Sequence, residues 1–207
     1  MCIRDRINPE QKEQVLRLGK ELPKVFSKIP GCTHLVEHAI ETDPGVVVRS
    51  NERLWPRQLA SVIEKEVDEM IKLGVIEPAK GPWRSYPVMV RKPDGSLRFC
   101  IDIRKVNAVS KFNVYPMPKI GDLLDHLGGA QYLSSIHLNK GYWQIPVRPQ
   151  DREKTAFCTP KGLYQFVKMP FGLHGVAVTF QRLMDQVLTP LRDCEPRGAV
   201  VKPLYCS

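Results

Sequence analysis

The sequence predicts an α+β fold, and its composition and its pattern of apolar residues both support that class. The chain has 207 residues, of which 43% are apolar and 26% charged, as in an ordinary globular protein. Segments with helical spacing alternate with short strand-like segments, and they follow no regular strand–helix–strand rhythm. The length allows one sizeable domain or two small ones.

Apolar residues at helical spacing predict four helices, which cover residues 7–29, 56–73, 120–127 and 179–188. The first is amphipathic and is closed by Pro23 and Pro30. The second is the clearest, because Pro56 suits a first helical turn and Gly74 stands where a C-terminal cap is expected.

Strands are predicted between the helices. The best signal is Asp94-Gly95, which lies between two β-rich runs at residues 87–90 and 97–103 and indicates a hairpin. A second pair of strands is predicted around the turn Lys161-Gly162. Its strands cover residues 157–159 and 165–169, and single extended segments are expected at 45–48, 75–78, 113–118 and 132–138.

The net charge of +9 favours a polyanionic partner, because Lys and Arg gain affinity by releasing counterions from phosphates. The alternative is a basic protein without such a partner. Six scattered cysteines form no C-x-x-C pair, which argues against structural zinc and for reduced thiols. Neither a membrane span nor a signal peptide is found, so a cytoplasmic or nuclear protein without a membrane partner is expected.

Five blocks of sequence, in order, resemble the reverse transcriptase of gypsy-type LTR retrotransposon Pol polyproteins. They are KLGVIEPAKGPWRSYPVMVRKPDGSLRFCIDIRKVN (Lys72 to Asn107), YPMPKIGDLL (Tyr115 to Leu124), YLSSIHLNKGYWQI (Tyr132 to Ile145), DREKTAFCTPKGLYQF (Asp151 to Phe166) and MPFGLHGVAVTFQRLMD (Met169 to Asp185). Each block is weak alone, but the shared order and spacing make the resemblance specific. It spans about residues 50–190.

The resemblance implies a right-hand polymerase fold, of which this chain carries the fingers and a partial palm. Residues 1–50 are then an N-terminal extension, and residues 51–192 form the reverse transcriptase part. The strand at 132–138 belongs to the palm. Residues 193–207 match nothing in the family and are interpreted as an aberrant tail, so the chain is interpreted as a truncated, degenerate copy.

The resemblance also implies an RNA-directed DNA polymerase, a nucleotidyltransferase that uses Mg²⁺ held by three aspartates. His137 stands at the position of the first aspartate. Imidazole nitrogen suits zinc or copper better than magnesium, and no second ligand for such a metal is evident. The later aromatic-x-Asp-Asp hairpin is not found, and the single Asp193 is no substitute. We therefore expect no metal ligand here and no productive Mg²⁺ binding.

Other positions that match the family keep its residue types. Lys92 and Arg98 fall where the family contacts the triphosphate of the incoming nucleotide; the alternative is a solvated hairpin tip. Tyr142 falls where an aromatic ring selects deoxynucleotides; the alternative is a packing role. Phe171 and Gly172 match the segment beneath the template–primer base pair, and Gly172 would permit close backbone approach.

Trp83 is expected either to stack on a template base or to pack in the core. The helix near residue 176 departs from the family, since Gly175-Val176-Ala177-Val178 replaces Asn-Ala-Pro-Ala. The loss of that proline predicts a looser helix start.

Three hypotheses for function remain. The chain is an inactive fragment of a reverse transcriptase, a binding remnant that still holds RNA or DNA template–primer and deoxynucleotides, or the functionless product of a decayed element.

Overall fold

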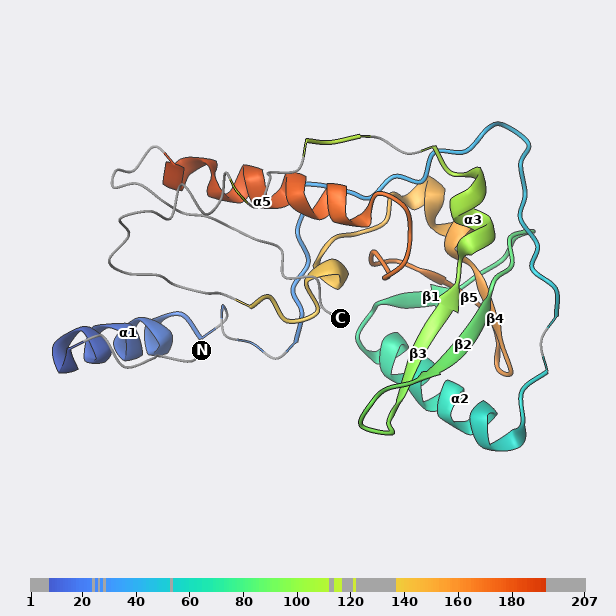
Figure 1. Cartoon of the computed structure of the whole chain (residues 1–207), viewed down its shortest axis with the longest axis horizontal. Coiled ribbons are helices and arrows are strands. Elements are labelled where there is room, and N and C mark those ends of the chain that lie inside the picture. The colour runs from blue at the N-terminus through green and yellow to red at the C-terminus, as the bar shows by residue number, and fades with distance from the viewer. Residues whose placement is uncertain are drawn as a thin grey trace.

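The computed structural model describes residues 8–192, except 24, 26, 28, 53, 112–113, 117–120 and 122–136. The described helices are α1 (Pro9–Glu21), α2 (Arg57–Lys72), α3 (Arg104–Val109) and α5 (Val176–Arg192), with 3-10 turns η1 (Gly141–Gln144) and η2 (Pro149–Thr155). The strands are β1 (Ile76–Pro78), β2 (Tyr86–Arg91), β3 (Leu97–Asp102), β4 (Phe157–Thr159) and β5 (Gly162–Phe166). In Figure 1, α5 runs along the top of the molecule, while the β2–β3 hairpin projects downward beside α2. The α+β class is confirmed.

Helix α2 forms where its apolar stripe predicts. It buries Ile63, Val67 and Met70, which recur at helical spacing on one face. Pro56 is the N-cap residue, and Gly74 adopts a φ of +63°, the left-handed conformation that ends helices. Strand β1 then leads away as expected.

The β2–β3 hairpin has the predicted place and turn. Its antiparallel register runs from Tyr86 opposite Asp102 to Arg91 opposite Leu97. The Lys92 N–H donates to the Ser96 carbonyl at 2.8 Å, and Gly95 adopts a φ of +80°. The Asp94 carboxylate accepts hydrogen bonds from the Ser96 hydroxyl and N–H, and these lower the pKa of Asp94. The turn is therefore held by its own residues.

A second sheet has the strand order β1-β5-β4. Strand β5 begins at Gly162, earlier than predicted, because the turn after β4 needs only Pro160 and Lys161. The two sheets are joined at one bridge, where the Ser85 N–H donates to the Ala156 carbonyl and the Cys158 N–H donates to the Ser85 carbonyl, both at 2.9 Å.

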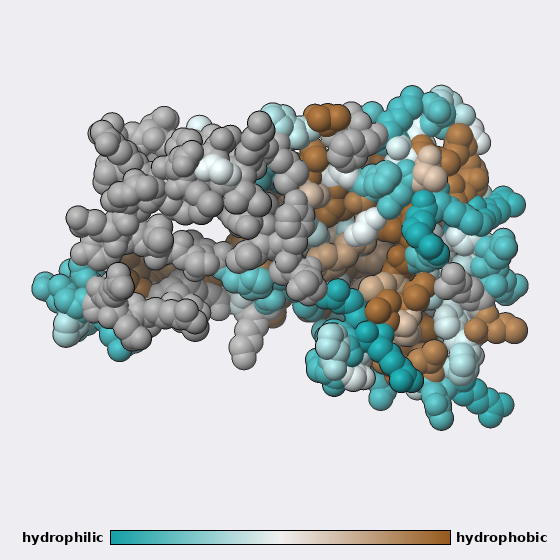
Figure 2. Space-filling view, viewed as in Figure 1, coloured by the Kyte–Doolittle hydropathy of each residue, from teal (hydrophilic) through white to brown (hydrophobic). Residues whose placement is uncertain are grey.

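The core has two clusters. One lies under α2 and the β1-β5-β4 sheet around the fully buried Phe157, and its buried residues are Ile63, Val67, Met70, Val75, Ile76, Phe157 and Phe166. The other gathers under α3 and α5 and includes Ile40, Val48, Trp83, Ile103, Val106, Phe180 and Leu183. In Figure 2 apolar residues lie across the middle of the described part and in smaller patches toward its right edge, among hydrophilic residues.

Several predicted boundaries are wrong or incomplete. Residues 45–48 form no strand, because Gly45 turns with a φ of +78° and only Arg49 makes a single bridge, to Arg84. The helix within 7–29 stops at Glu21, and that near 179–188 extends to Val176–Arg192, so the lost proline did not prevent its start. Helix α3 was missed. Of the helix expected at 120–127 only residue 121 is described, and the tail at 193–207 lies wholly outside the described residues. Of the extended segment at 113–118, residues 114–116 are described and lie in no strand.

We call residues 33–50 the strap, because they run alongside α5 and past α3 (Figure 1). Backbone bonds tie the strap to three regions: the His38 N–H donates to the Pro146 carbonyl, the Lys111 N–H to the Glu41 carbonyl and the Ser50 N–H to the Arg84 carbonyl. Ile40 and Val48 are buried in the core. The strap is thus part of the packed body, and the boundary after residue 50 stays a prediction.

Candidate nucleotide-binding site

The hairpin places its two predicted phosphate-binding cations on an exposed surface. Lys92 begins the turn after β2, and Arg98 lies on β3 opposite Val90. Both side chains are exposed. The self-contained turn fixes their backbone positions, and their charge is available to an anionic ligand.

Tyr142 and Phe171, which are far apart in the sequence, lie against each other. Their ring centroids are 5.0 Å apart, and Phe180 of α5 meets Tyr142 edge-on at 5.3 Å. These separations are typical of favourable aromatic pairs. Phe171 remains 47% exposed, while Met169 two residues earlier is fully buried. The three rings therefore form an aromatic platform with one open side, built from η1, the loop before α5 and α5 itself.

The turn η1 that carries Tyr142 is held on its other side. Lys140, which precedes it, adopts the left-handed φ of +47°. The Lys140 Nζ lies 4.4 Å from the centre of the Trp143 ring and 3.6 Å from Glu69 Oε1 of α2. Tyr142 packs toward the α5 core cluster and Trp143 toward the α2 cluster, so η1 spans both.

Gly172 has a backbone conformation that favours glycine, while its expected approach to a base pair stays a prediction. Its φ is +89°, which other residues rarely adopt, and a Cβ at this position would lie 3.5 Å from Ile103 Cδ1. Asn107 of α3 holds the same loop: its Nδ2 donates to the Gly172 carbonyl at 2.7 Å, and its Oδ1 accepts the His174 N–H at 2.9 Å. No local sequence pattern indicates this role of Asn107, because the loop that it binds is distant in sequence.

Trp83 is 3% exposed and belongs to the core cluster under α5. The structure thus shows the packing alternative, and the ring offers no face for stacking on a base. Arg49 Nε donates to the carbonyl of the neighbouring Pro82, which ties this part of the chain to the strap.

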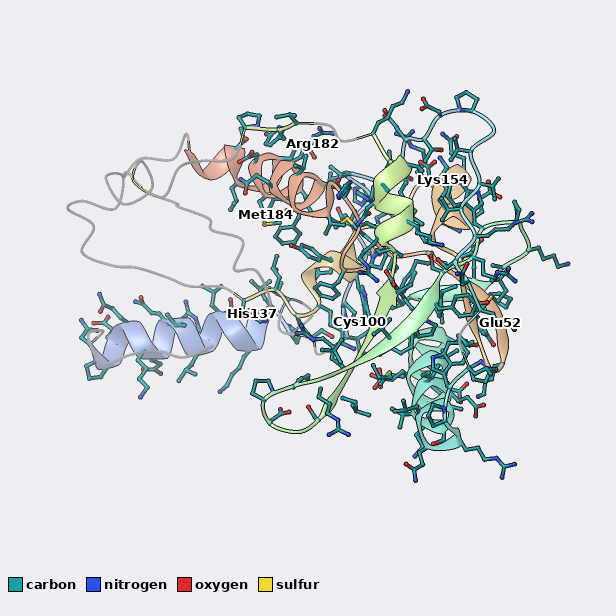
Figure 3. The ribbon with its side chains drawn as sticks, turned by 45° about the vertical axis from the view of Figure 1, so that its right-hand side comes forward. Glu52, Cys100, His137, Lys154, Arg182 and Met184 are labelled. Carbon is teal, nitrogen blue, oxygen red and sulfur yellow. The ribbon has the colours of Figure 1, made fainter. Side chains whose placement is uncertain are left out.

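His137 lies where the described chain resumes. It is exposed and, like Leu138, outside any strand, so the described end of the predicted palm strand is irregular; residues 132–136 lie outside the description. Figure 3 shows His137 on the side of the body away from Glu52 and Lys154. Among the described residues, no three His, Cys, Asp or Glu side chains gather closely enough to hold a metal ion.

An open cleft of about 580 Å³ lies between the strap and α3, lined by Ser50, Asn51, Glu52, Tyr86, Asp102, Arg104, Lys105 and Ala108. Arg104 and Asp102 form a two-point ion pair at its edge, with both N–O distances 2.8 Å. Hydrogen bonding to Asp102 raises the pKa of Arg104. The sequence carries no local signal for this cleft, since its lining comes from residues 50–52, the start of β2, the end of β3 and α3.

Comparison with known proteins shows to which family the chain belongs. Residues 90–204 match the reverse transcriptase (RNA-dependent DNA polymerase) family. The chain belongs to the reverse transcriptase family. The match runs into residues 193–204, so the interpretation of that segment as an aberrant tail stays a prediction.

Two relatives of this reverse transcriptase-like chain are Pol polyproteins of Drosophila melanogaster. The polyprotein of transposon 297 is 35% identical over 77% of this chain, and that of transposon gypsy is 32% identical over 91%. The chain spans only 16% and 19% of their lengths. It is a reverse transcriptase-like fragment of a retrotransposon Pol polyprotein.

A solved structure shares the fold. The foamy viral protease-reverse transcriptase in complex with an RNA/DNA hybrid superimposes with a TM-score of 0.76 at 19% identity, covering 96% of this chain and 28% of that one. The architecture is accordingly an α+β polymerase fold. No helix in the described part of this chain is both long and apolar enough to cross a bilayer.

Proposed function

We propose that this reverse transcriptase-like chain binds a primer–template without catalysing DNA synthesis. The observation that carries the proposal is a contrast between the expected nucleic-acid contacts and the expected metal site. The hairpin and the aromatic platform keep residue types suited to nucleic acid, whereas residue 137 carries an imidazole in place of a carboxylate.

The imidazole does not fit the metal that the family uses. Magnesium prefers hard oxygen ligands, and phosphoryl transfer depends on such ions to neutralise developing charge. His137 contributes no negative charge and no oxygen, so we derive no catalytic step through a metal at this site.

The binding part of the proposal rests on charge and stacking. Lys92 and Arg98 present two cations from a fixed hairpin, and counterion release from phosphates would supply affinity. The exposed face of Phe171 would contribute stacking, which depends little on base identity. In the solved neighbour the nucleic acid is an RNA/DNA hybrid, and we propose the same class of ligand here.

Fluorescence anisotropy with a labelled primer–template tests the binding. Replacing both Lys92 and Arg98 with Ala should weaken binding and reduce the slope of log affinity against log salt by roughly 1.4–1.8, the effect of two lost phosphate contacts. The matched control is Lys12→Ala with Lys20→Ala on α1, which removes the same charge elsewhere and should leave the slope unchanged. Equal effects of the two double variants would refute a specific role for the hairpin.

Primer extension tests the absence of chemistry. The purified chain, supplied with deoxynucleotides and either Mg²⁺ or Mn²⁺, should add no nucleotide to a primer that it binds. Robust extension would overturn this part of the proposal and leave the binding part standing.

A further inference from the structure

The loop that carries Phe171 is held from below by one face of α3. Ile103, the N-cap residue, and Asn107 within the helix both reach the same loop residue, Gly172. Ile103 contacts the position of Gly172, and the Asn107 side chain makes two hydrogen bonds to the backbone, at Gly172 and His174. One amide therefore satisfies a carbonyl acceptor and an N–H donor of the same loop.

The helix is itself a firm support. Val106, beside Asn107, is buried in the core, and the Ser110 hydroxyl donates to the Val106 carbonyl at 2.7 Å. The ion pair of Arg104 with Asp102 ties the start of α3 to the end of β3. Asn107 is thus presented by an element that cannot easily follow the loop if the loop moves.

The exposed part of the loop depends on this support more than the buried residues on either side of it do. Met169 and Leu173 are buried and anchor it, but Phe171 and Gly172 between them are exposed. The Asn107 amide makes two hydrogen bonds from α3 to this exposed stretch, beside the apolar contact of Ile103. Losing a hydrogen-bond partner frees backbone groups that can then turn toward water.

We propose that Asn107 is a positioning residue that fixes residues 171–174 so that the Phe171 ring stays against Tyr142 and completes the aromatic platform. This inference rests on the proposed function insofar as the platform receives nucleic acid. Asn107 itself touches no ligand in the proposal; it acts through the loop.

The test compares Asn107→Ala with Asn107→Asp by amide hydrogen exchange and by NMR cross-peaks between the Tyr142 and Phe171 rings. Alanine removes both hydrogen bonds. Aspartate keeps the acceptor for His174, but its second oxygen, when ionised, faces the Gly172 carbonyl and cannot donate. We expect about tenfold faster exchange at residues 171–174 in both variants at pH 7.5, with weakened ring cross-peaks.

Acid should rescue only the aspartate variant. A protonated carboxyl donates to Gly172 and accepts from His174, as the amide does. Because the ordinary pKa of an aspartate is about 3.9, Asn107→Asp should approach the wild type at about pH 3.5, while Asn107→Ala should not. The wild type at each pH serves as reference. A merely destabilised fold would show no such rescue, and the aspartate variant keeps the test valid even if the alanine variant unfolds.

Primer–template affinity gives a second readout. Asn107→Ala should bind about tenfold more weakly with an unchanged salt slope, because no phosphate contact is lost. Unchanged exchange at 171–174, or faster exchange with intact ring cross-peaks, would overturn the inference. If the wild-type chain binds no primer–template, the proposed function fails, while the exchange and cross-peak measurements still decide the role of Asn107.

Discussion

The β2–β3 hairpin and the strap both carry many exposed residues, yet they are held in opposite ways. The hairpin is closed by bonds between near neighbours, such as Ser96 to Asp94. The strap is held by partners distant in sequence, two of them more than 100 residues away: the Ile40 N–H donates to Asp151, and Lys154 donates to the Ile40 carbonyl. The difference teaches that local sequence can encode the first region, while the second exists only when the rest of the body has folded.

Removing the strap should have the largest effect. A chain that begins at residue 51 loses Ile40 and Val48 from the core, each contributing about 1.5–3 kcal/mol by burial, and leaves Asp151 and Lys154 without their backbone partners. That loss approaches the whole stability of a typical domain, about 5–15 kcal/mol. We expect no cooperative thermal transition by circular dichroism.

The matched control is a chain that begins at residue 31. It loses α1, which buries none of its residues, and should melt like the full chain. If the chain from residue 51 melts as sharply as the chain from residue 31, the domain boundary predicted after residue 50 is correct and the strap is dispensable.

Breaking the buried ion pair that binds the strap should have the next largest effect. Asp151 and Lys154 lie 2.7 Å apart with side chains only 5% and 15% exposed. Asp151→Ala leaves a buried ammonium and the Ile40 N–H without their acceptor, which should cost about 3 kcal/mol in urea unfolding. Asp43→Ala, at the solvent-screened pair with Lys111, should cost far less. Equal costs would contradict the burial argument.

Acid should loosen the strap before it affects the hairpin. Burial lowers the pKa of His38 to about 4, against the opposing effect of Asp151, and His38 Nδ1 lies 2.9 Å from Thr179 Oγ1. Because the unfolded chain has a pKa near 6.5, it binds the proton more readily, so stability is full above pH 6.5 and falls as the pH drops toward 4.

Between pH 7 and pH 5 the loss should be about 2 kcal/mol by urea unfolding. His38→Gln removes the titrating group and should flatten that part of the profile. A His38→Gln profile as steep as that of the wild type would assign the pH dependence to other groups.

The contrast also explains what the sequence could predict. Helix α2 and the hairpin were predicted because their signals, the stripe around Val67 and the pair Asp94-Gly95, lie within one short window. The family resemblance added Tyr142 and Phe171, whose contact at 5.0 Å no local pattern indicates.

What was missed depends on distant partners. Helix α3 carries a β-branched, polar sequence with little helical signal, and it is held by the burial of Val106 and by the loop that Asn107 binds. In the strap the sequence predicted only an extended segment at 45–48. Nothing in residues 33–50 indicates that His38 is buried or that the Ile40 N–H binds Asp151.

The smallest expected effect lies in the hairpin and tests its local character. Gly95 has a φ of +80° and no atom within 4 Å of a would-be Cβ, so Gly95→Ala adds only backbone strain, about 1–2 kcal/mol. Gly31→Ala, at a position that is equally open but has no positive φ, should be neutral or stabilising by up to about 1 kcal/mol.

Gly95→Asn should recover part of the loss, since asparagine tolerates the left-handed region. If the turn is self-contained, the strain should appear as faster amide exchange at Lys92 and Ser96 while the His38 amide in the strap keeps its protection, because within the described part of the chain no backbone hydrogen bond joins the two regions. Equal loss of protection in both regions would mean that the hairpin and the strap unfold as one unit. The distinction between local and distant encoding would then describe how each region forms, but not how stable each region is.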